Sequence, residues 1–314
     1  MTSAKPLRFS TPLSPHERWA DMEPMVRAAQ RAEALGYFGV TLPEHIVMPV
    51  KLGVEPMNVV WFDNFVLGSH IASLTQRIRL IFCVMVVPYR PAVQTAKQIA
   101  TLDQVSKGRL IVGVGAGWMR AEFRNLGLPF DERGAMTDEY LAAMRALWTQ
   151  ESPSFQGKHV SFTSLIFQPK CYQKPHAPLW IGGSGPRILR RVVEHGQGWM
   201  PMVGTIDDMA RDIREVKQRT KAAGRDPDAL DFSFSIVVGE RDEYSEKARA
   251  HVVKERNVIR PQAVTVPEIV DLLGEYRAAG FTHLGVSWKW RTIPEYMEGL
   301  EWFAREIMPR VSSS

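Results

Sequence analysis

One stretch of the chain, Pro178-Leu179-Trp180-Ile181-Gly182-Gly183-Ser184-Gly185-Pro186-Arg187, passes from a strand pattern into a helix pattern across a glycine-rich turn. Its first part is a short apolar run, which is typical of a buried parallel strand. Beyond the glycines, apolar residues recur at helical spacing, at positions 188, 189, 192 and 193. A strand, a turn and a helix in this order predict one β–α unit of a parallel sheet.

The same turn is a candidate anion site. Backbone N–H groups of Gly183, Ser184 and Gly185, just after Gly182, would face a phosphate, and a helix start adds partial positive charge. Arg187 in the first helical turn would add a charge-assisted contact. The alternative is a tight turn without a ligand, because a Gly-Gly pair also serves wherever the backbone needs a positive φ.

The alternation of strand and helix recurs along the chain. Eight strand-like runs are each followed by a helix-like run, and they lie at residues 6–11, 37–42, 78–87, 109–114, 179–182, 198–201, 231–238 and 282–288. Only the proline-rich residues 150–177 break this order, and their alternating pattern predicts a hairpin-bearing insertion. We therefore predict a single α/β domain over residues 1–314, a (β/α)₈ barrel, with an open doubly wound sheet as the alternative.

The composition limits the kind of protein this is. The chain has 314 residues, 45% of them hydrophobic and 23% charged, with a net charge of +5. The basic residues are spread out, which argues against a nucleic-acid partner, and no metal-ligand spacing appears. No secretory leader or membrane-length apolar run is present, so the prediction is a cytoplasmic protein.

The first candidate for chemistry is His45, because ligands of such barrels bind where the strands end. His45 follows the second strand, in a loop (residues 43–61) whose length indicates function. Its imidazole would transfer a proton near neutral pH, whereas the alternative is a histidine that caps the strand or faces solvent. Neighbouring Glu44 is predicted to be a structural partner of an arginine or of a helix N-terminus.

Glycines and aromatic residues mark the other strand ends. Residues 113–118 carry glycines at alternating positions, which would let a flat ring approach the backbone near Ala116 and Gly117. Their spacing is not that of a dinucleotide-binding turn. Aromatic residues near strand ends are either ordinary core or the lining of an apolar substrate pocket. Those assigned to the pocket are Trp61, Tyr89, Trp118, Trp199 and Trp288.

Taken together, several stretches resemble the bacterial luciferase-like monooxygenase superfamily, in particular its branch of coenzyme F420-dependent oxidoreductases. The similarity covers most of the chain. The stretches that carry it are RAEALGYFGV (31–40) before Glu44-His45, PYRPAV (88–93), ATLDQVSKGRL (100–110) with residues 113–118, and IGGSG (181–185). One departure is Trp118, which stands where the sugar-phosphate dehydrogenase branch has an acid, so that chemistry is not expected.

This resemblance implies a homodimeric barrel with a flavin or deazaflavin at its carboxyl-terminal end. It implies a non-prolyl cis peptide bond at Cys83-Val84 in contact with the ring, a cofactor phosphate at Gly182–Gly185, and a catalytic role for His45. The leading functional prediction is hydride transfer between coenzyme F420 and a largely apolar small molecule. The alternatives are an FMN-dependent monooxygenase that is served by a flavin reductase, and a non-catalytic flavin-binding protein on the same fold.

Overall fold

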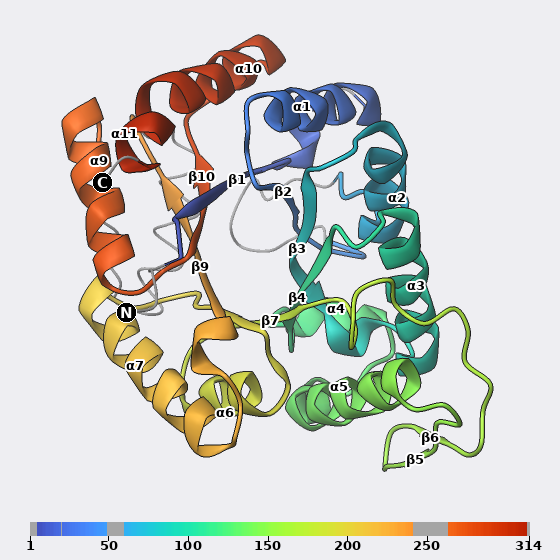
Figure 1. Cartoon of the computed structure of the whole chain (residues 1–314). Helices are drawn as coiled ribbons and strands as arrows, with labels where there is room; N and C mark the ends of the chain where they lie inside the picture. The colour runs from blue at the N-terminus through green and yellow to red at the C-terminus, as the bar shows by residue number, and fades with distance from the viewer. Residues whose placement is uncertain (1–4, 20, 49–59, 241–262, 313–314) are drawn as a thin grey trace.

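Eight parallel strands close into a barrel in the computed structural model, which describes residues 5–19, 21–48, 60–240 and 263–312. The order around the barrel is β1-β10-β9-β8-β7-β4-β3-β2 (Figure 1). The strands are β1 (Arg8–Pro12), β2 (Gly39–Leu42), β3 (Arg79–Val86), β4 (Leu110–Gly115), β7 (Leu179–Gly182), β8 (Gly198–Met200), β9 (Asp231–Val237) and β10 (His283–Ser287). The predicted (β/α)₈ barrel is confirmed, and the open sheet is excluded by the pairing of β1 with both β2 and β10.

A helix follows each strand and lies on the outside of the barrel (Figure 1). These helices are α1 (Met22–Ala34), α2 (Asn64–Leu74), α3 (Ala92–Val105), α5 (Arg133–Thr149), α6 (Pro186–His195), α7 (Ile206–Ala222), α9 (Val266–Ala278) and α10 (Ile293–Trp302). Two shorter helices are α4 (Arg120–Asn125), between β4 and α5, and α11 (Met308–Ser312). Capping hydrogen bonds fix where two of these helices begin. At the start of α7 the Thr205 hydroxyl accepts from the Asp208 N–H at 3.1 Å, and at the start of α9 the Glu268 carboxylate accepts from the Thr265 N–H at 2.9 Å.

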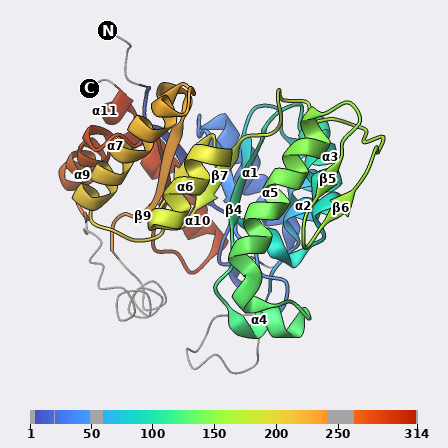
Figure 2. The same cartoon turned by 90° about the horizontal axis from the view of Figure 1, so that it is seen from below.

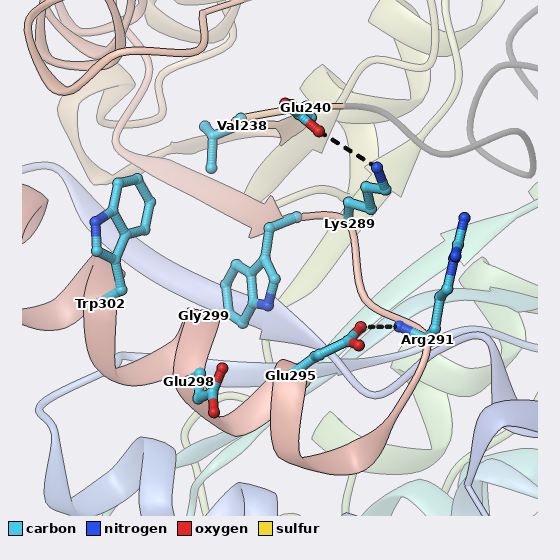
Figure 3. Close-up of a pocket in the computed structure, with 10 residues that line it drawn as sticks. Val238, Glu240, Lys289, Arg291, Glu295, Glu298, Gly299 and Trp302 are labelled. Atoms are coloured by element: carbon cyan, nitrogen blue, oxygen red, sulfur yellow. Dashed lines mark hydrogen bonds and ion pairs between the residues drawn. The ribbon is translucent and has the colours of Figure 1, made fainter.

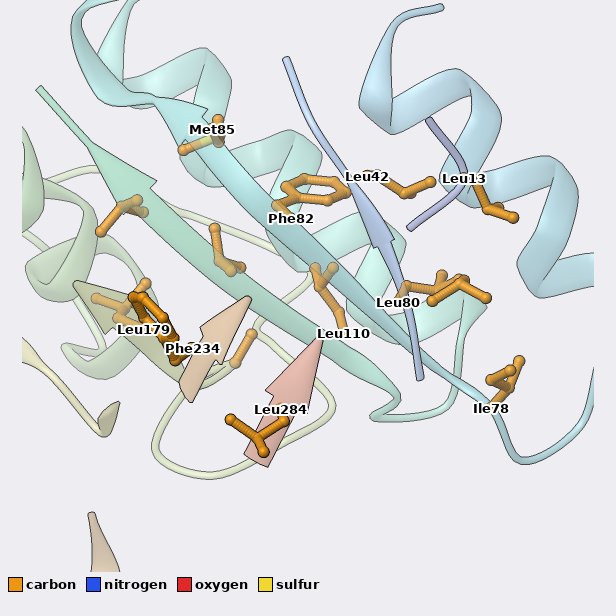
Figure 4. Packing of buried hydrophobic residues seen from close by; sticks show 14 of the residues in the cluster. Leu13, Leu42, Ile78, Leu80, Phe82, Met85, Leu110, Leu179, Phe234 and Leu284 are labelled. Atoms are coloured by element: carbon orange, nitrogen blue, oxygen red, sulfur yellow. The ribbon is translucent and has the colours of Figure 1, made fainter. Parts of the chain in front are cut away.

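The apolar core has two layers because successive strand residues point to opposite faces. Leu80 and Phe82 of β3 are fully buried between the barrel and its helices, beside Leu110 of β4 (Figure 4). Ile81 of the same strand instead packs inside the barrel, with Ile111, Trp180 and Met200 as neighbours. Each such side chain contributes roughly 1.5–3 kcal/mol on burial, so the layers hold the strand ends in a fixed arrangement.

The insertion predicted over residues 150–177 contains an antiparallel hairpin, formed by β5 (Phe155–Gln156) and β6 (Ser161–Phe162). It lies beside α5, at the periphery of the barrel (Figures 1 and 2). The Glu139 carboxylate of α5 accepts from the N–H groups of residues 158–160, at 3.1, 2.6 and 2.7 Å. This carboxylate joins the hairpin to the helix and leaves the strand ends of the barrel uncovered by it.

Candidate functional site

The parallel strands all finish at one end of the barrel, called the mouth here, and α4 projects beyond the barrel at this end (Figure 2). At the mouth the Cys83-Val84 peptide bond is cis, as the resemblance implied. The pairing of β3 with β4 shifts register between Phe82 and Met85, around this bond. The strand therefore bulges where it reaches the mouth.

Glycines surround the Val84 side chain. A Cβ built on Gly115 of β4 or on Gly182 of β7 would lie 2.8 Å from a Val84 methyl group, so neither position has room for a side chain. Deeper in β4, a Cβ on Gly113 would lie 2.0 Å from the Phe82 carbonyl oxygen. The floor of the mouth is thus backbone and one valine, a surface that a flat ring can approach.

The turn after β7 has the backbone expected of its glycines. Gly183 has a φ of +117° and Gly185, the residue before α6, a φ of +98°. The Gly183 N–H is not available to a ligand, contrary to the prediction, because it donates to the Met200 carbonyl at 3.0 Å. The N–H groups of Ser184, Gly185 and Arg187 have no acceptor among the described residues, and they lie at the start of α6.

Two side-chain hydrogen bonds tie this turn to β8 and to the loop after it. The Trp199 indole N–H donates to the Gly183 carbonyl at 2.8 Å, and the Ser184 hydroxyl donates to the Val203 carbonyl at 3.1 Å. The Arg187 side chain is exposed and has no ion-pair partner within the part of the chain that the structure describes. The turn is therefore held rigidly while its outward donors stay available to an anion.

His45 lies at the mouth with a buried carboxylate that the sequence analysis did not identify. Its Nδ1 is 2.9 Å from Oε2 of Glu122, a fully buried residue of α4. The Tyr89 hydroxyl donates to the same oxygen at 2.7 Å. The other oxygen, Oε1, accepts from the N–H groups of Ile46 and Val47 at 2.6 and 3.2 Å. Burial alone would raise the pKa of Glu122, but these donors outweigh it and hold the pKa below its usual range.

Two indoles contact the His45 ring. Its centroid is 4.7 Å from that of Trp61 and 6.2 Å from that of Trp118, both in edge-on geometry. His16, after β1, packs in turn against Trp61 at 5.2 Å. Burial lowers the pKa of His16 to about 4, so this second imidazole is neutral at physiological pH. Of the aromatic residues predicted to line the pocket, Trp61 and Trp118 do lie beside the candidate histidine.

Glu44 has the structural role predicted for it. Its carboxylate accepts from Arg90 at 2.6 Å and from the Val86 N–H at 2.7 Å. Arg90 also pairs with Asp63, the residue that caps α2, at 2.7 Å. Burial raises the pKa of Glu44, against the opposing effect of the Arg90 guanidinium. This network joins the ends of β2 and β3 to the start of α2.

The remaining aromatic candidates have other surroundings. Tyr89 is buried and its hydroxyl donates to Glu122, so it supports the carboxylate that holds His45. Trp199 has no exposed surface, because it packs in the core and bonds to the turn, so its assignment to a substrate surface is wrong in this structure. Trp288 follows β10 and packs against Tyr296 and Gly299 of α10. Its assignment to the substrate pocket stays a prediction.

Trp288 lines a cavity of about 540 Å³ between the ends of β9 and β10 and the helix α10. Figure 3 shows charged side chains on its walls, including the ion pair of Lys289 with Glu240 at 3.3 Å. Trp302 closes it on one side. Five of its ten lining residues are charged, and two, Trp288 and Trp302, carry indoles.

The described residues hold no cluster of three or more potential metal ligands. Among the helices in the described ranges, none has the length and apolar character needed to cross a bilayer.

Comparison with known proteins agrees with this architecture. The sequence profile of the luciferase-like monooxygenase family matches residues 6–283. A protein of Mycobacterium tuberculosis, the uncharacterized protein Rv0953c, is 34% identical over 211 residues, which are 63% of this chain and 74% of that protein. The FMNH(2)-dependent dimethylsulfone monooxygenase of Pseudomonas putida is 29% identical over 206 residues, 64% of this chain and 55% of that enzyme.

Solved structures with the same fold include a monooxygenase and an F420-dependent dehydrogenase. The monooxygenase RslO1 of Streptomyces bottropensis superposes with a TM-score of 0.79 at 22% identity, covering 96% of this chain and 99% of that one. An F420-dependent secondary alcohol dehydrogenase, solved with an F420-acetone adduct, superposes with a TM-score of 0.78 at 20% identity, covering 98% and 99%.

Proposed function

Because the chain belongs to the luciferase-like monooxygenase family, whose members are oxidoreductases, we propose that it is a coenzyme F420-dependent oxidoreductase. The observation that carries this proposal is the imidazole of His45, which is bound to the Glu122 carboxylate through Nδ1. Its other nitrogen, Nε2, has no partner among the described residues, and the ring as a whole lies beside those of Trp61 and Trp118. A histidine held in this way suits proton transfer to or from a substrate oxygen.

The mouth fits a deazaflavin in two respects. The backbone floor at Gly115, Val84 and Gly182 offers a flat ring a close approach. The free N–H groups of Ser184, Gly185 and Arg187 at the start of α6 suit the cofactor's phosphate. When bound, F420 supplies the group that accepts or donates the hydride. We assign ring contacts to Cys83, Val84, Ala116 and Gly117, and the phosphate to residues 182–187.

The step of the proposed reaction that residues of this chain carry out is the proton transfer. In the oxidation of an alcohol, Nε2 of His45 would take the proton from the substrate hydroxyl as the O–H bond breaks. In the reverse direction the protonated ring would return it to the carbonyl oxygen. The Glu122 carboxylate stabilises the imidazolium that exists between these events, because it lies 2.9 Å from Nδ1.

A largely apolar substrate is proposed from the side chains around the mouth. Ile46, Val47 and Trp118 are 38, 38 and 51% exposed, and they follow β2 and β4, beside His45. Met202, after β8, is 49% exposed. Exposed large apolar side chains gathered at one end of a barrel favour binding of apolar ligands. Small ketones, enones and secondary alcohols combine such a body with the oxygen that His45 requires.

The test is equilibrium binding of F420 and of FMN to the purified protein, followed by a panel of alcohols, ketones and enones with each redox form. We expect F420 to bind more tightly than FMN and its absorbance to change with an apolar alcohol or enone. Tight binding of FMN alone, or turnover confined to phosphorylated sugars, would contradict the proposal. The same preparation tests the homodimer that we propose, by sedimentation.

A second candidate is an FMN-dependent monooxygenase that receives reduced flavin from a reductase. The observation in its favour is the 29% identity to an FMNH(2)-dependent monooxygenase. Oxygen consumption with reduced FMN separates the two candidates, since a deazaflavin does not activate oxygen readily.

A further inference from the structure

Both oxygens of the Glu122 carboxylate accept two hydrogen bonds each. Four donors reach its two oxygens: the Tyr89 hydroxyl and His45 Nδ1 at Oε2, and the N–H groups of Ile46 and Val47 at Oε1. An ionised carboxylate accepts hydrogen bonds and donates none. The group is fully buried, so losing any of these partners would leave a buried charge short of a hydrogen bond.

This arrangement decides which nitrogen of His45 carries the hydrogen. The partner of Nδ1 is an acceptor, so Nδ1 must be the donor. In the neutral ring Nε2 then holds the lone pair. The opposite tautomer would place a lone pair of Nδ1 against the carboxylate at 2.9 Å, which is repulsive.

The Glu122 carboxylate also fixes the position of the His45 ring. Its other oxygen binds the backbone immediately after His45, and Tyr89, from the segment after β3, holds the first oxygen from another side. Side chain and backbone of one short segment are thus attached to a single residue of α4. The edge-on contacts with Trp61 and Trp118 leave the ring little freedom to rotate.

We propose that Glu122 is the positioning residue for His45: it selects the Nδ1–H tautomer, presents Nε2 to the substrate and stabilises the protonated ring. Tyr89 completes the assembly by holding the carboxylate. This inference rests on the proposed function for its chemical purpose, but the tautomer and the ring orientation are properties of the protein alone.

The decisive measurement is therefore nitrogen NMR on protein labelled with ¹⁵N-histidine, without cofactor or substrate. The signal of His45 among the eight histidines is identified by its loss in His45→Phe. We expect the wild type to show a protonated Nδ1 and an unprotonated Nε2 above neutral pH. In Glu122→Gln we expect a mixture of the two tautomers. Finding Nε2–H as the main tautomer of the wild type would overturn the inference, whether or not any variant folds.

Kinetics give the second test, with Glu132→Gln as the matched control, since Glu132 is a half-exposed acid that pairs with Lys158 outside the site. We expect Glu122→Gln to lower kcat by on the order of 10²-fold, with KM changed far less and the pH–rate profile shifted. Glu122→Asp should recover part of kcat, because it keeps the charge. An unchanged pH profile and tautomer in Glu122→Gln would make the residue structural only. Failure of the proposed function looks different: no cofactor would bind, while the tautomer would remain as stated.

Discussion

Two regions at the mouth of the same barrel handle their polar groups in opposite ways. Around His45, both oxygens of Glu122 and of Glu44 have donors within the protein. In the turn after β7, three N–H groups and the Arg187 side chain have no partner among the described residues. A region whose buried carboxylates are fully paired is built before any ligand arrives, whereas a turn with unpaired donors is completed by one. Proton transfer needs the first condition and anion binding the second.

The largest effect should come from removing the imidazole from the paired region. We expect His45→Phe to lower turnover about 10²–10⁴-fold, because the ring's bulk between the indoles stays and only its nitrogens are lost. Cofactor affinity should change little, since the anion turn is untouched. The measurement is steady-state turnover beside equilibrium cofactor binding. Turnover within a few-fold of the wild type would return His45 to a capping role.

The next largest effect should come from placing a charge in the unpaired region. Gly185 has open space around its Cβ position but a φ of +98°, so any side chain there carries the same backbone strain. We therefore compare Gly185→Asp with Gly185→Asn, which differ only in charge. We expect the aspartate variant to bind cofactor roughly 100-fold more weakly than the asparagine variant, from like-charge repulsion with the phosphate. Equal affinities, measured by fluorescence titration, would remove the turn from the cofactor site.

A third effect concerns stability and its dependence on pH. Arg90→Met leaves the Glu44 carboxylate buried without its cation, and we expect a loss of about 3 kcal/mol in the free energy of unfolding at pH 7. Burial already raises the pKa of Glu44, and the substitution raises it further. An acid whose pKa is higher in the folded than in the unfolded chain destabilises the folded state at every pH where the acid is ionised in the unfolded chain. The deficit should therefore shrink as pH falls toward the ordinary glutamate range.

Denaturant unfolding between pH 4.5 and 8 measures this deficit, and the double variant Arg90→Met/Glu44→Gln is the control. Restored stability in the double variant is expected. A deficit that is independent of pH would mean that lost packing, rather than the unpaired charge, explains it.

The smallest effect should come from Arg187→Ala. This side chain is exposed, so its contact with an anion is screened by salt, and we expect only a few-fold loss of cofactor affinity. The difference from the wild type should fall as salt is raised. A loss that stays constant from low to high salt would indicate a packing role instead.

Much of the fold could be predicted from sequence because its signals are local. Strand-like runs, each followed by a helix-like run, marked all eight strands. Glu122 could not be found in this way. It bonds to a residue 77 positions earlier in the chain, and only the folding of α4 over the loop after β2 brings the two together. The one available signal was an acid one helical turn after Trp118, close to where a related branch carries its acid.

The prediction that Trp199 lines the substrate pocket failed for another reason. Position at a strand end does not say whether a side chain faces the mouth, the core or the surrounding helices. Trp199 faces the turn from within the core, and Trp288 faces α10. The pleat fixes the direction of each side chain, and a shift of one residue in a strand's end reverses it.

The contact at Gly113 limits how this protein can be re-engineered. With the Phe82 carbonyl 2.0 Å from where a Cβ would sit, no substitution at position 113 can be accommodated without moving β3. Loop exchanges intended to alter selectivity should therefore join the scaffold beyond Gly115, and libraries that randomise the end of β4 should hold residues 113 and 115 constant. Gly117 should be held constant as well, because its φ is +81° and a Cβ there would lie 2.8 Å from Val86 of β3 and 2.6 Å from Phe123.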